Sequence, residues 1–256
     1  MPLYQAIVLA IVQGLTEFLP ISSTAHLTLF PWLLGWKDPG LTFDIALHAG
    51  TLVAVLVYFW RYWLEMFGTA VGRDWGGNPG LGLDRKLLGF LAAATIPAGV
   101  AGWLFESAAE EELRSPFIIG VALVVLHQVG FVDSVLVGVA QAFAVIPGVS
   151  RSGATMTAGL FRGMKRDTAA RLSFLLFTPI IAGAALKKGL EIRHTGVPHE
   201  MVLPFVLGII VAAVVGYLVI AALIRYLERR TFRIFIVYRV ALGVLVLALG
   251  WGLRHA

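Results

Sequence analysis

Apolar segments long enough to cross a membrane recur along almost the whole of this 256-residue chain. A bilayer core about 30 Å thick is crossed by about 20 apolar residues in a helix. Hydrophobic residues make up 59% of the chain and charged residues only 14%, whereas charged residues make up about 25% of a soluble domain. The sequence therefore predicts an all-α polytopic membrane protein that forms a single membrane domain over residues 1–256.

Six segments have the length and apolar character of transmembrane helices, although the third is short. They are residues 44–63, 83–105, 116–130, 169–186, 202–224 and 234–253. The chain has no cysteine, which excludes disulfide bonds and thiol chemistry. We therefore expect about six transmembrane helices without covalent cross-links.

Two further apolar segments are interrupted and do not have the pattern of simple spans. Residues 3–34 are broken by Pro20 and residues 135–161 by Pro147, and a serine-rich turn follows each proline. Each half has about 12 to 16 residues, which is too short to cross the bilayer and suits a re-entrant hairpin. Irregular backbone is tolerated at membrane depth only inside protein or beside a water-filled cavity. Each break is therefore a candidate site.

The two hairpins, residues 13–26 and 141–155, resemble each other. Each begins with a glutamine, reaches a proline after a similar distance, and continues with serines and a threonine. This similarity predicts half-repeats of about residues 1–130 and 131–256. Three spans lie between the hairpins, and this odd number makes the second hairpin enter the membrane from the opposite side. Such inverted repeats place a binding site near the middle of the bilayer.

Lysines and arginines are unevenly distributed between the two sides of the predicted membrane domain. The side with loops 63–83, 162–166 and 225–233 carries eleven of them, and the other side carries six together with the acidic run 110–112. Because basic loops are typically cytoplasmic, the first side should be cytoplasmic and the mouth of the first hairpin should face outward. This topology also accounts for the net charge of +5, so no nucleic-acid partner is expected.

Arg151 lies in the middle of an apolar segment, where an arginine costs about 2.5–3.5 kcal/mol on membrane-insertion scales. Such a residue needs an anionic partner, and a guanidinium binds phosphate through a fork of two hydrogen bonds. Ser150 and Ser152 offer hydroxyl donors beside it. Gly148 and Gly153 let backbone N–H groups approach a ligand closely, and a helix beginning nearby adds its positive end. The cluster therefore predicts a phosphate-binding site.

The first hairpin supplies groups that can move protons. Gln13 and Glu17 are four residues apart and therefore share a helix face. His26 ionises in the range that suits general acid–base catalysis. Ser22 or Ser23 near His26 resembles a nucleophile beside its base.

Two alternatives stay open at this point. Arg151 and Glu17 form either part of a phosphate site or a structural ion pair without a ligand. Asp44 and His48 are at i,i+4 spacing. They have a role at the site, as part of the polar pocket or as metal ligands, or they mark a solvated helix end.

The two interrupted segments also carry specific motifs. Residues 13–26 read QGLTEFLPISSTAH, and residues 147–155 read PGVSRSGAT. Together they resemble the two signature motifs of the undecaprenyl-diphosphate phosphatase family, the bacitracin-resistance proteins of bacterial membranes. The resemblance covers nearly the whole chain. It implies hydrolysis of undecaprenyl diphosphate to undecaprenyl phosphate and inorganic phosphate, which recycles the lipid carrier for peptidoglycan synthesis.

The resemblance also implies a set of site residues by position. The implied catalytic residues are Glu17, Ser23, His26 and Arg151, and the implied diphosphate-binding residues are Gln13, Ser22, Ser150, Arg151, Ser152 and Thr155. A divalent cation, magnesium or calcium, is implied beside Glu17. Gln13 stands where many members have glutamate, which weakens any role that needs two carboxylates. Two routes stay open: attack by Ser23 with His26 as base, or attack by water with Glu17 or His26 as base.

The implied location is the bacterial inner membrane, with a multi-pass chain and an active site facing outward. The implied partners are a polyprenyl diphosphate lipid and membrane lipid, and a homodimer is allowed. The alternative is a polyprenyl-phosphate flippase or transporter, because inverted repeats with broken helices are a transporter arrangement. Transport does not require the Glu17, Ser23 and His26 group, so this group favours the enzyme. A structural scaffold, the third reading, has no need to bury Arg151.

Overall fold

The computed structural model describes residues 1–73, 150–161 and 163–255, together with a few residues between 88 and 100. The predicted span 116–130 and the first half of the second hairpin lie outside the described residues, and the span 83–105 lies largely outside them. The single membrane domain and its two half-repeats stay predictions.

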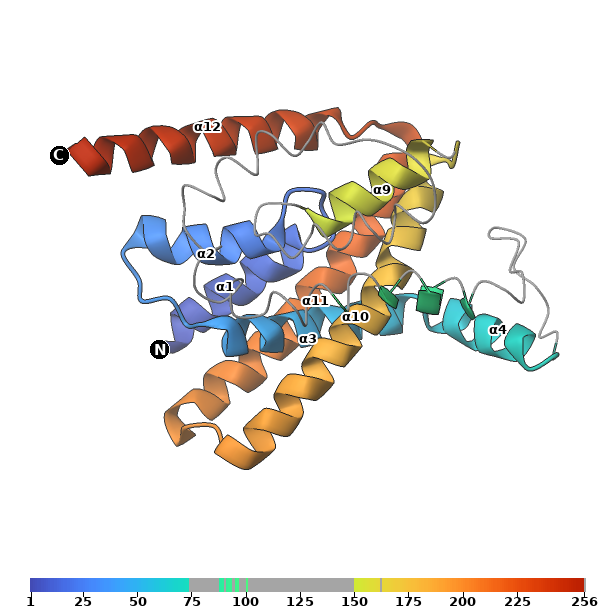
Figure 1. The fold of residues 1–256 in the computed structure, drawn as a ribbon, viewed down its shortest axis with the longest axis horizontal. Helices are drawn as coiled ribbons and strands as arrows, with labels where there is room; N and C mark the ends of the chain where they lie inside the picture. The colour runs from blue at the N-terminus through green and yellow to red at the C-terminus, as the bar shows by residue number, and fades with distance from the viewer. Residues whose placement is uncertain are drawn as a thin grey trace.

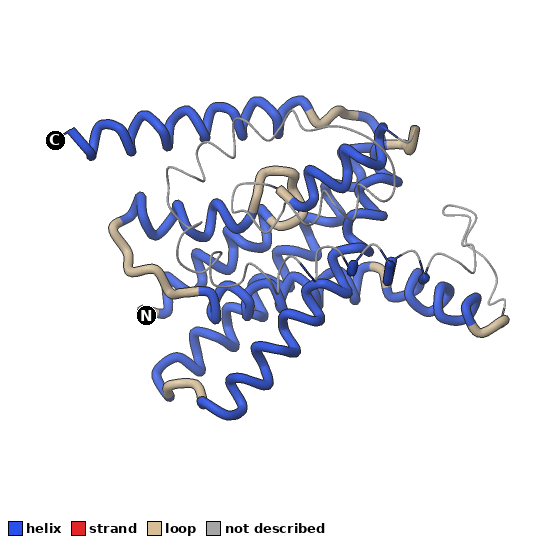
Figure 2. The backbone as a smooth tube through the Cα atoms, in the orientation of Figure 1, coloured by secondary structure: helices blue, strands red, loops and turns tan. Residues whose placement is uncertain are grey.

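Every regular element in the described part of the chain is an α-helix (Figure 2). The helices are α1 (Leu3–Thr16), α2 (Ser23–Leu34), α3 (Leu41–Tyr58), α4 (Trp60–Ala70), α9 (Arg151–Phe161), α10 (Arg166–Thr195), α11 (His199–Arg229) and α12 (Arg233–His255). Among them, α3, α10 and α11 are long and apolar enough to cross a membrane. The helical class is confirmed and a membrane protein is supported, while six spans and an inverted repeat stay predictions.

Three of the predicted spans fall inside helices of the structure. Residues 169–186 lie within α10, residues 202–224 within α11 and residues 234–253 within α12. α10 and α11 have 30 and 31 residues, and at 1.5 Å per residue each is about 45 Å long, longer than the bilayer core of about 30 Å. Their ends therefore extend beyond the apolar stretches that the sequence pattern marks.

The first predicted span, residues 44–63, is wrong in its bounds. α3 begins earlier, at Leu41, and ends at Tyr58. Phe59 leaves the helical conformation, with φ −101° and ψ 20°, and α4 begins at Trp60. The Phe59 ring is fully buried and packs against Tyr58 and, across the helix interface, Phe174 of α10. α3 and α4 therefore meet at Phe59, at a point where the apolar run contains neither proline nor glycine to mark a break.

The first interrupted segment forms the expected helix–turn–helix. α1 ends at Thr16, a turn follows, and α2 begins at Ser23. Proline disfavours helical backbone at the preceding residue, so Pro20 keeps the turn open. α2 ends at Leu34, and Gly35 follows with a φ of 65°, the left-handed conformation that commonly closes a helix.

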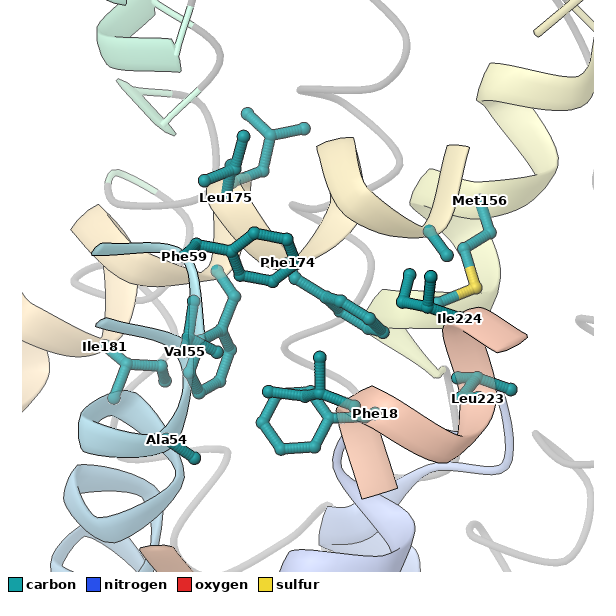
Figure 3. Close-up of a cluster of buried hydrophobic side chains, with 14 of the residues drawn as sticks. Phe18, Ala54, Val55, Phe59, Met156, Phe174, Leu175, Ile181, Leu223 and Ile224 are labelled. Atoms are coloured by element: carbon teal, nitrogen blue, oxygen red, sulfur yellow. The ribbon is translucent and has the colours of Figure 1, made fainter. Parts of the chain in front are cut away.

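α11 packs along α3 and α1, and α10 packs against α3 and α9 (Figure 1). A cluster of buried side chains that includes Phe18 joins α3, α9, α10 and α11 (Figure 3). The Phe18 ring meets the Phe174 ring edge to face, with centroids 5.1 Å apart. Because Phe18 follows Glu17 directly, this core fixes the turn of the first motif.

Candidate active site

The carboxylate of Glu17 is the centre of the polar cluster. Its Oε1 lies 2.5 Å from Nη2 of Arg151. Its Oε2 accepts a hydrogen bond from Nε2 of Gln13 at 2.8 Å and a short one from the Ser23 hydroxyl, and lies 3.2 Å from Nε2 of His48. The structure therefore brings residues of both motifs to one buried carboxylate, with His48 added from α3.

Arg151 is the first residue of α9 and lies against two different groups. One edge of its guanidinium meets Glu17, and its face lies over the Phe177 ring of α10, with 4.5 Å to the ring centroid. Cation–π contacts of this kind contribute about 0.5–2 kcal/mol. Within the described part of the chain, Glu17 is the one hydrogen-bond acceptor of this guanidinium. Most of the N–H donors of the arginine side chain therefore have no acceptor among the described residues and can bind a ligand, and the side chain is 20% exposed.

The hydroxyl groups of the second motif secure the start of α9. Ser150 Oγ accepts a hydrogen bond from the backbone N–H of Gly153 at 3.0 Å and lies 3.2 Å from Ser152 Oγ. Ser152 donates to the carbonyl oxygen of Leu19 at 3.1 Å, which ties α9 to the turn of the first motif. Thr155 is turned the other way, toward the carbonyl oxygen of Arg151 at 2.9 Å and the α10 hydroxyl of Ser173 at 2.5 Å.

Two helices begin beside this cluster, α2 at Ser23 and α9 at Arg151 (Figure 1). The first backbone N–H groups of a helix have no partner within it, and together with the helix dipole they favour an anion. The hydrogen bond from Ser152 to Leu19 and the ion pair between Arg151 and Glu17 hold the start of α9 against the turn before α2. The arrangement suits a phosphate group.

His26 lies in α2, three residues after Ser23, but its ring nitrogens contact other groups. Nδ1 donates to the carbonyl oxygen of Ser22 at 2.7 Å, and Nε2 lies 2.8 Å from the hydroxyl oxygen of Tyr238. Ser22 has a φ of 71°, a sparsely populated conformation for a residue other than glycine. The Ser23 hydroxyl donates to Glu17 in this structure, whereas the sequence pattern suggested His26 as its partner.

The geometry decides whether Asp44 and His48 belong to the site or to a solvated helix end. Both side chains are buried. His48 donates from Nδ1 to the backbone carbonyl oxygen of Asp44 at 2.7 Å and turns Nε2 toward Glu17. His48 therefore extends the polar cluster, and Asp44, which is buried, does not mark a solvated helix end.

Three residues near the site were absent from the sequence-based set: Phe177, Tyr238 and Arg239. Phe177 and Tyr238 are single aromatic residues in apolar helices, and no local pattern distinguishes them from packing residues. Arg239 is 4% exposed, and an arginine inside an apolar segment is the same signal that identified Arg151. It was therefore detectable from the sequence.

Oxygen ligands for a cation are few in this cluster. The described residues contain no group of three or more histidine, cysteine, aspartate and glutamate side chains that could hold a metal ion. Gln13 Oε1 is nevertheless buried, with no hydrogen-bond partner among the described residues, next to the Glu17 carboxylate. Mg²⁺ commonly takes one or two protein oxygens and completes its shell with water and substrate phosphates. The residues present fit a cation that arrives with a phosphate ligand.

Comparison with known proteins assigns this site to a family. A family model described as bacitracin resistance protein BacA matches residues 6–245, which include both motifs. The chain belongs to the BacA family. It is 47% identical to a protein of Moorella thermoacetica, over 98% of this chain and 99% of that protein. It is 44% identical to one of Pelotomaculum thermopropionicum, over 97% of each.

A third BacA-family relative, from Desulforudis audaxviator, is 47% identical over 96% of this chain and 97% of its own length. All three relatives carry the name undecaprenyl-diphosphatase. The resemblance of the two motifs to this family is therefore confirmed at the level of the whole chain.

Proposed function

We propose that this chain hydrolyses undecaprenyl diphosphate to undecaprenyl phosphate and inorganic phosphate. The observation that carries the proposal is the contact between Glu17 and Arg151, which joins the two motifs in one buried site. The names of its BacA-family relatives support the substrate. The reaction recycles the lipid carrier for peptidoglycan synthesis and, by that route, confers resistance to bacitracin.

The diphosphate is held by donor groups around the starts of α2 and α9. The N–H groups of Arg151 that do not face Glu17 bind the terminal phosphate, with the Ser22 and Ser150 hydroxyls and the first N–H groups of α2 and α9 around it. The Ser152 hydroxyl exchanges its bond to the Leu19 carbonyl for one to the phosphate. Gln13 binds beside them through its amide. Thr155 acts indirectly in this scheme, because its hydroxyl bonds to α9 carbonyls and to Ser173 and so fixes the first turn of α9.

The hydrogen bond from Ser23 to Glu17 favours attack by the serine. Ser23 Oγ forms a bond to the terminal phosphorus while its proton passes to Glu17, and the bond from phosphorus to the bridging oxygen breaks. Polyprenyl monophosphate leaves. Water then attacks the phosphoserine and gives a proton to His26 while the bond from phosphorus to Ser23 Oγ breaks. Ser23 regains its proton from Glu17, and inorganic phosphate leaves. Arg151 stabilises the equatorial oxygens, which carry the charge in the loose transition state of phosphoryl transfer.

A divalent cation, magnesium or calcium, is part of the proposal. Gln13 Oε1 and a Glu17 oxygen would hold it, and it would supply neutralisation of phosphate charge. Glu17 already faces Arg151 and His48, so the phosphates themselves must provide most of the ligands. Removal of the cation should therefore weaken substrate binding.

The site faces outward from the bacterial inner membrane in this proposal, and the isoprenoid tail stays in lipid while the head group reaches the pocket. Positive charge on the loops of the opposite side supports this orientation. A homodimer is compatible with the proposal, which does not require one.

The test is phosphate release by the purified chain in detergent, with and without a chelator. A polyprenyl diphosphate should yield equimolar inorganic phosphate and polyprenyl monophosphate, and the chelator should raise KM. Detergent removes the barrier between two membrane sides, so transport alone gives no product. Binding of the lipid without any release would contradict the enzyme and favour the flippase.

A further inference from the structure

The last helix reaches the first motif from the far end of the chain. Tyr238 of α12 places its hydroxyl oxygen 2.8 Å from Nε2 of His26, 212 positions earlier in the sequence. The two rings also stack, with centroids 5.7 Å apart and an angle of 10° between their planes. Tyr238 belongs to neither motif.

The other ring nitrogen of His26 determines the direction of this hydrogen bond. Nδ1 lies 2.7 Å from the carbonyl oxygen of Ser22, and a carbonyl only accepts, so Nδ1 carries the hydrogen. In the neutral imidazole Nε2 is then the acceptor, and the Tyr238 hydroxyl donates to it. The contacts therefore select one tautomer and one orientation of the ring.

α12 also lies against the second motif. The side chain of Arg239, the next residue, is buried, and its Nη1 lies 3.3 Å from the position that a Cβ atom at Gly153 would occupy. Consecutive residues of α12 therefore meet the two motifs, Tyr238 the first and Arg239 the second. The contact with His26 is therefore one of two neighbouring contacts by which α12 packs against the site.

We propose that Tyr238 is a positioning residue that acts through His26. Its hydroxyl keeps the imidazole in the Nδ1–H tautomer, with Nε2 unprotonated, and its ring fixes the imidazole plane. His26 is 2% exposed, so water does not readily replace the hydroxyl. A buried polar atom left without a partner is unfavourable, and the ring would therefore sample other tautomers and orientations. The role rests on the proposed hydrolysis.

The decisive variant is Tyr238→Phe, which keeps the stacked ring and removes only the hydroxyl. Tyr217→Phe on α11 is the matched control, because the two tyrosines are 42% and 41% exposed and Tyr217 contacts Tyr58, outside the site. Loss of a group that orients an imidazole typically costs about 10- to 100-fold. Phosphate release from a polyprenyl diphosphate in detergent should show kcat reduced by about this factor in Tyr238→Phe, with KM unchanged. Tyr217→Phe should match the wild type.

The tautomer of His26 provides a measurement that needs no turnover. In nitrogen-15 NMR of histidine-labelled protein, with the His26 signal identified by its loss in His26→Ala, the wild type should show protonated Nδ1 and unprotonated Nε2. Tyr238→Phe should show a mixture of tautomers. Unchanged kcat and an unchanged tautomer in Tyr238→Phe would overturn the positioning role. An inactive wild type with the expected tautomer shift would instead refute the hydrolysis and leave the contact established.

Discussion

Arg151 and Glu17 form an ion pair with 2.5 Å between Nη2 and Oε1, although 134 positions separate them in the sequence. Removal of one partner of a buried ion pair leaves the other charge uncompensated, which is strongly unfavourable. The pair therefore couples the turn of the first motif to the start of α9. Among the described residues, it engages only one edge of the Arg151 guanidinium, and the other N–H donors can receive a phosphate.

Arg151→Lys should separate the contribution of charge from that of geometry. Lysine keeps the positive charge but presents a point charge in place of the planar fork. Loss of a donor to the transition state typically costs about 10²–10³-fold in kcat, so we expect a loss near the lower end for lysine and a larger one for Arg151→Ala. Initial rates of phosphate release measure both. A lysine variant as active as the wild type would show that catalysis does not need the planar fork of guanidinium N–H donors.

Ser23→Ala should abolish formation of a phosphoserine and reduce phosphate release by at least about 10³-fold if the serine is the nucleophile. Thr28→Val is the control, because it also removes a buried hydroxyl of α2, one that donates to the carbonyl oxygen of Thr24 and not to Glu17. Acid-quenched enzyme analysed by mass spectrometry should carry phosphate on Ser23 in the wild type and in Thr28→Val. Substantial turnover by Ser23→Ala would instead favour direct attack by water.

Phe177→Leu should lower kcat/KM by about 2- to 30-fold, because it removes the ring face beneath the Arg151 guanidinium. Phe174→Leu is matched to it, since both rings are buried and both meet Phe18, with centroids 6.0 and 5.1 Å away. Both variants should lose thermal stability in detergent. Only Phe177→Leu should also lose activity per folded molecule. Equal activities in the two variants would show that the contact between the Phe177 ring and the Arg151 guanidinium does not contribute to catalysis.

Gly50→Ala should destabilise the packing of α3 against α11 by about 1–3 kcal/mol, because the new methyl group would overlap the carbonyl oxygen of Ile209. Gly183→Ala in α10 is the control, since a methyl group there meets nothing within 4 Å and improves helix propensity by about 1 kcal/mol. Thermal unfolding in detergent should show a lower midpoint for the first variant and an equal or higher one for the second. A stable Gly50→Ala protein would mean that the two helices can separate without penalty.

Much of the site was predictable because it consists of polar groups in apolar segments. Glu17 and Arg151 stand out there because a buried charge is costly without a partner. The i,i+4 spacing of Gln13 and Glu17 also predicted that the two side chains share a helix face. In the structure Nε2 of Gln13 donates to Oε2 of Glu17 at 2.8 Å. Arg239 met the same criterion and was missed.

Other features depend on contacts between distant helices, which local spacing does not encode. α3 ends beside the buried ring of Phe59, which packs against Phe174 of α10, and the partner of His26 is Tyr238 from α12. The proximity of Ser23 and His26 along α2 suggested a direct pair, but the turn before α2 brings the carboxylate of Glu17 to Ser23 instead.

The central claim is that both motifs form one site that hydrolyses a lipid diphosphate. Its most direct test is the rate of inorganic phosphate release from a polyprenyl diphosphate by purified wild type, Glu17→Ala and Arg151→Ala in parallel. The wild type should turn over and both variants should be inactive, although their substitutions lie in different motifs. Full activity in both variants would contradict the claim.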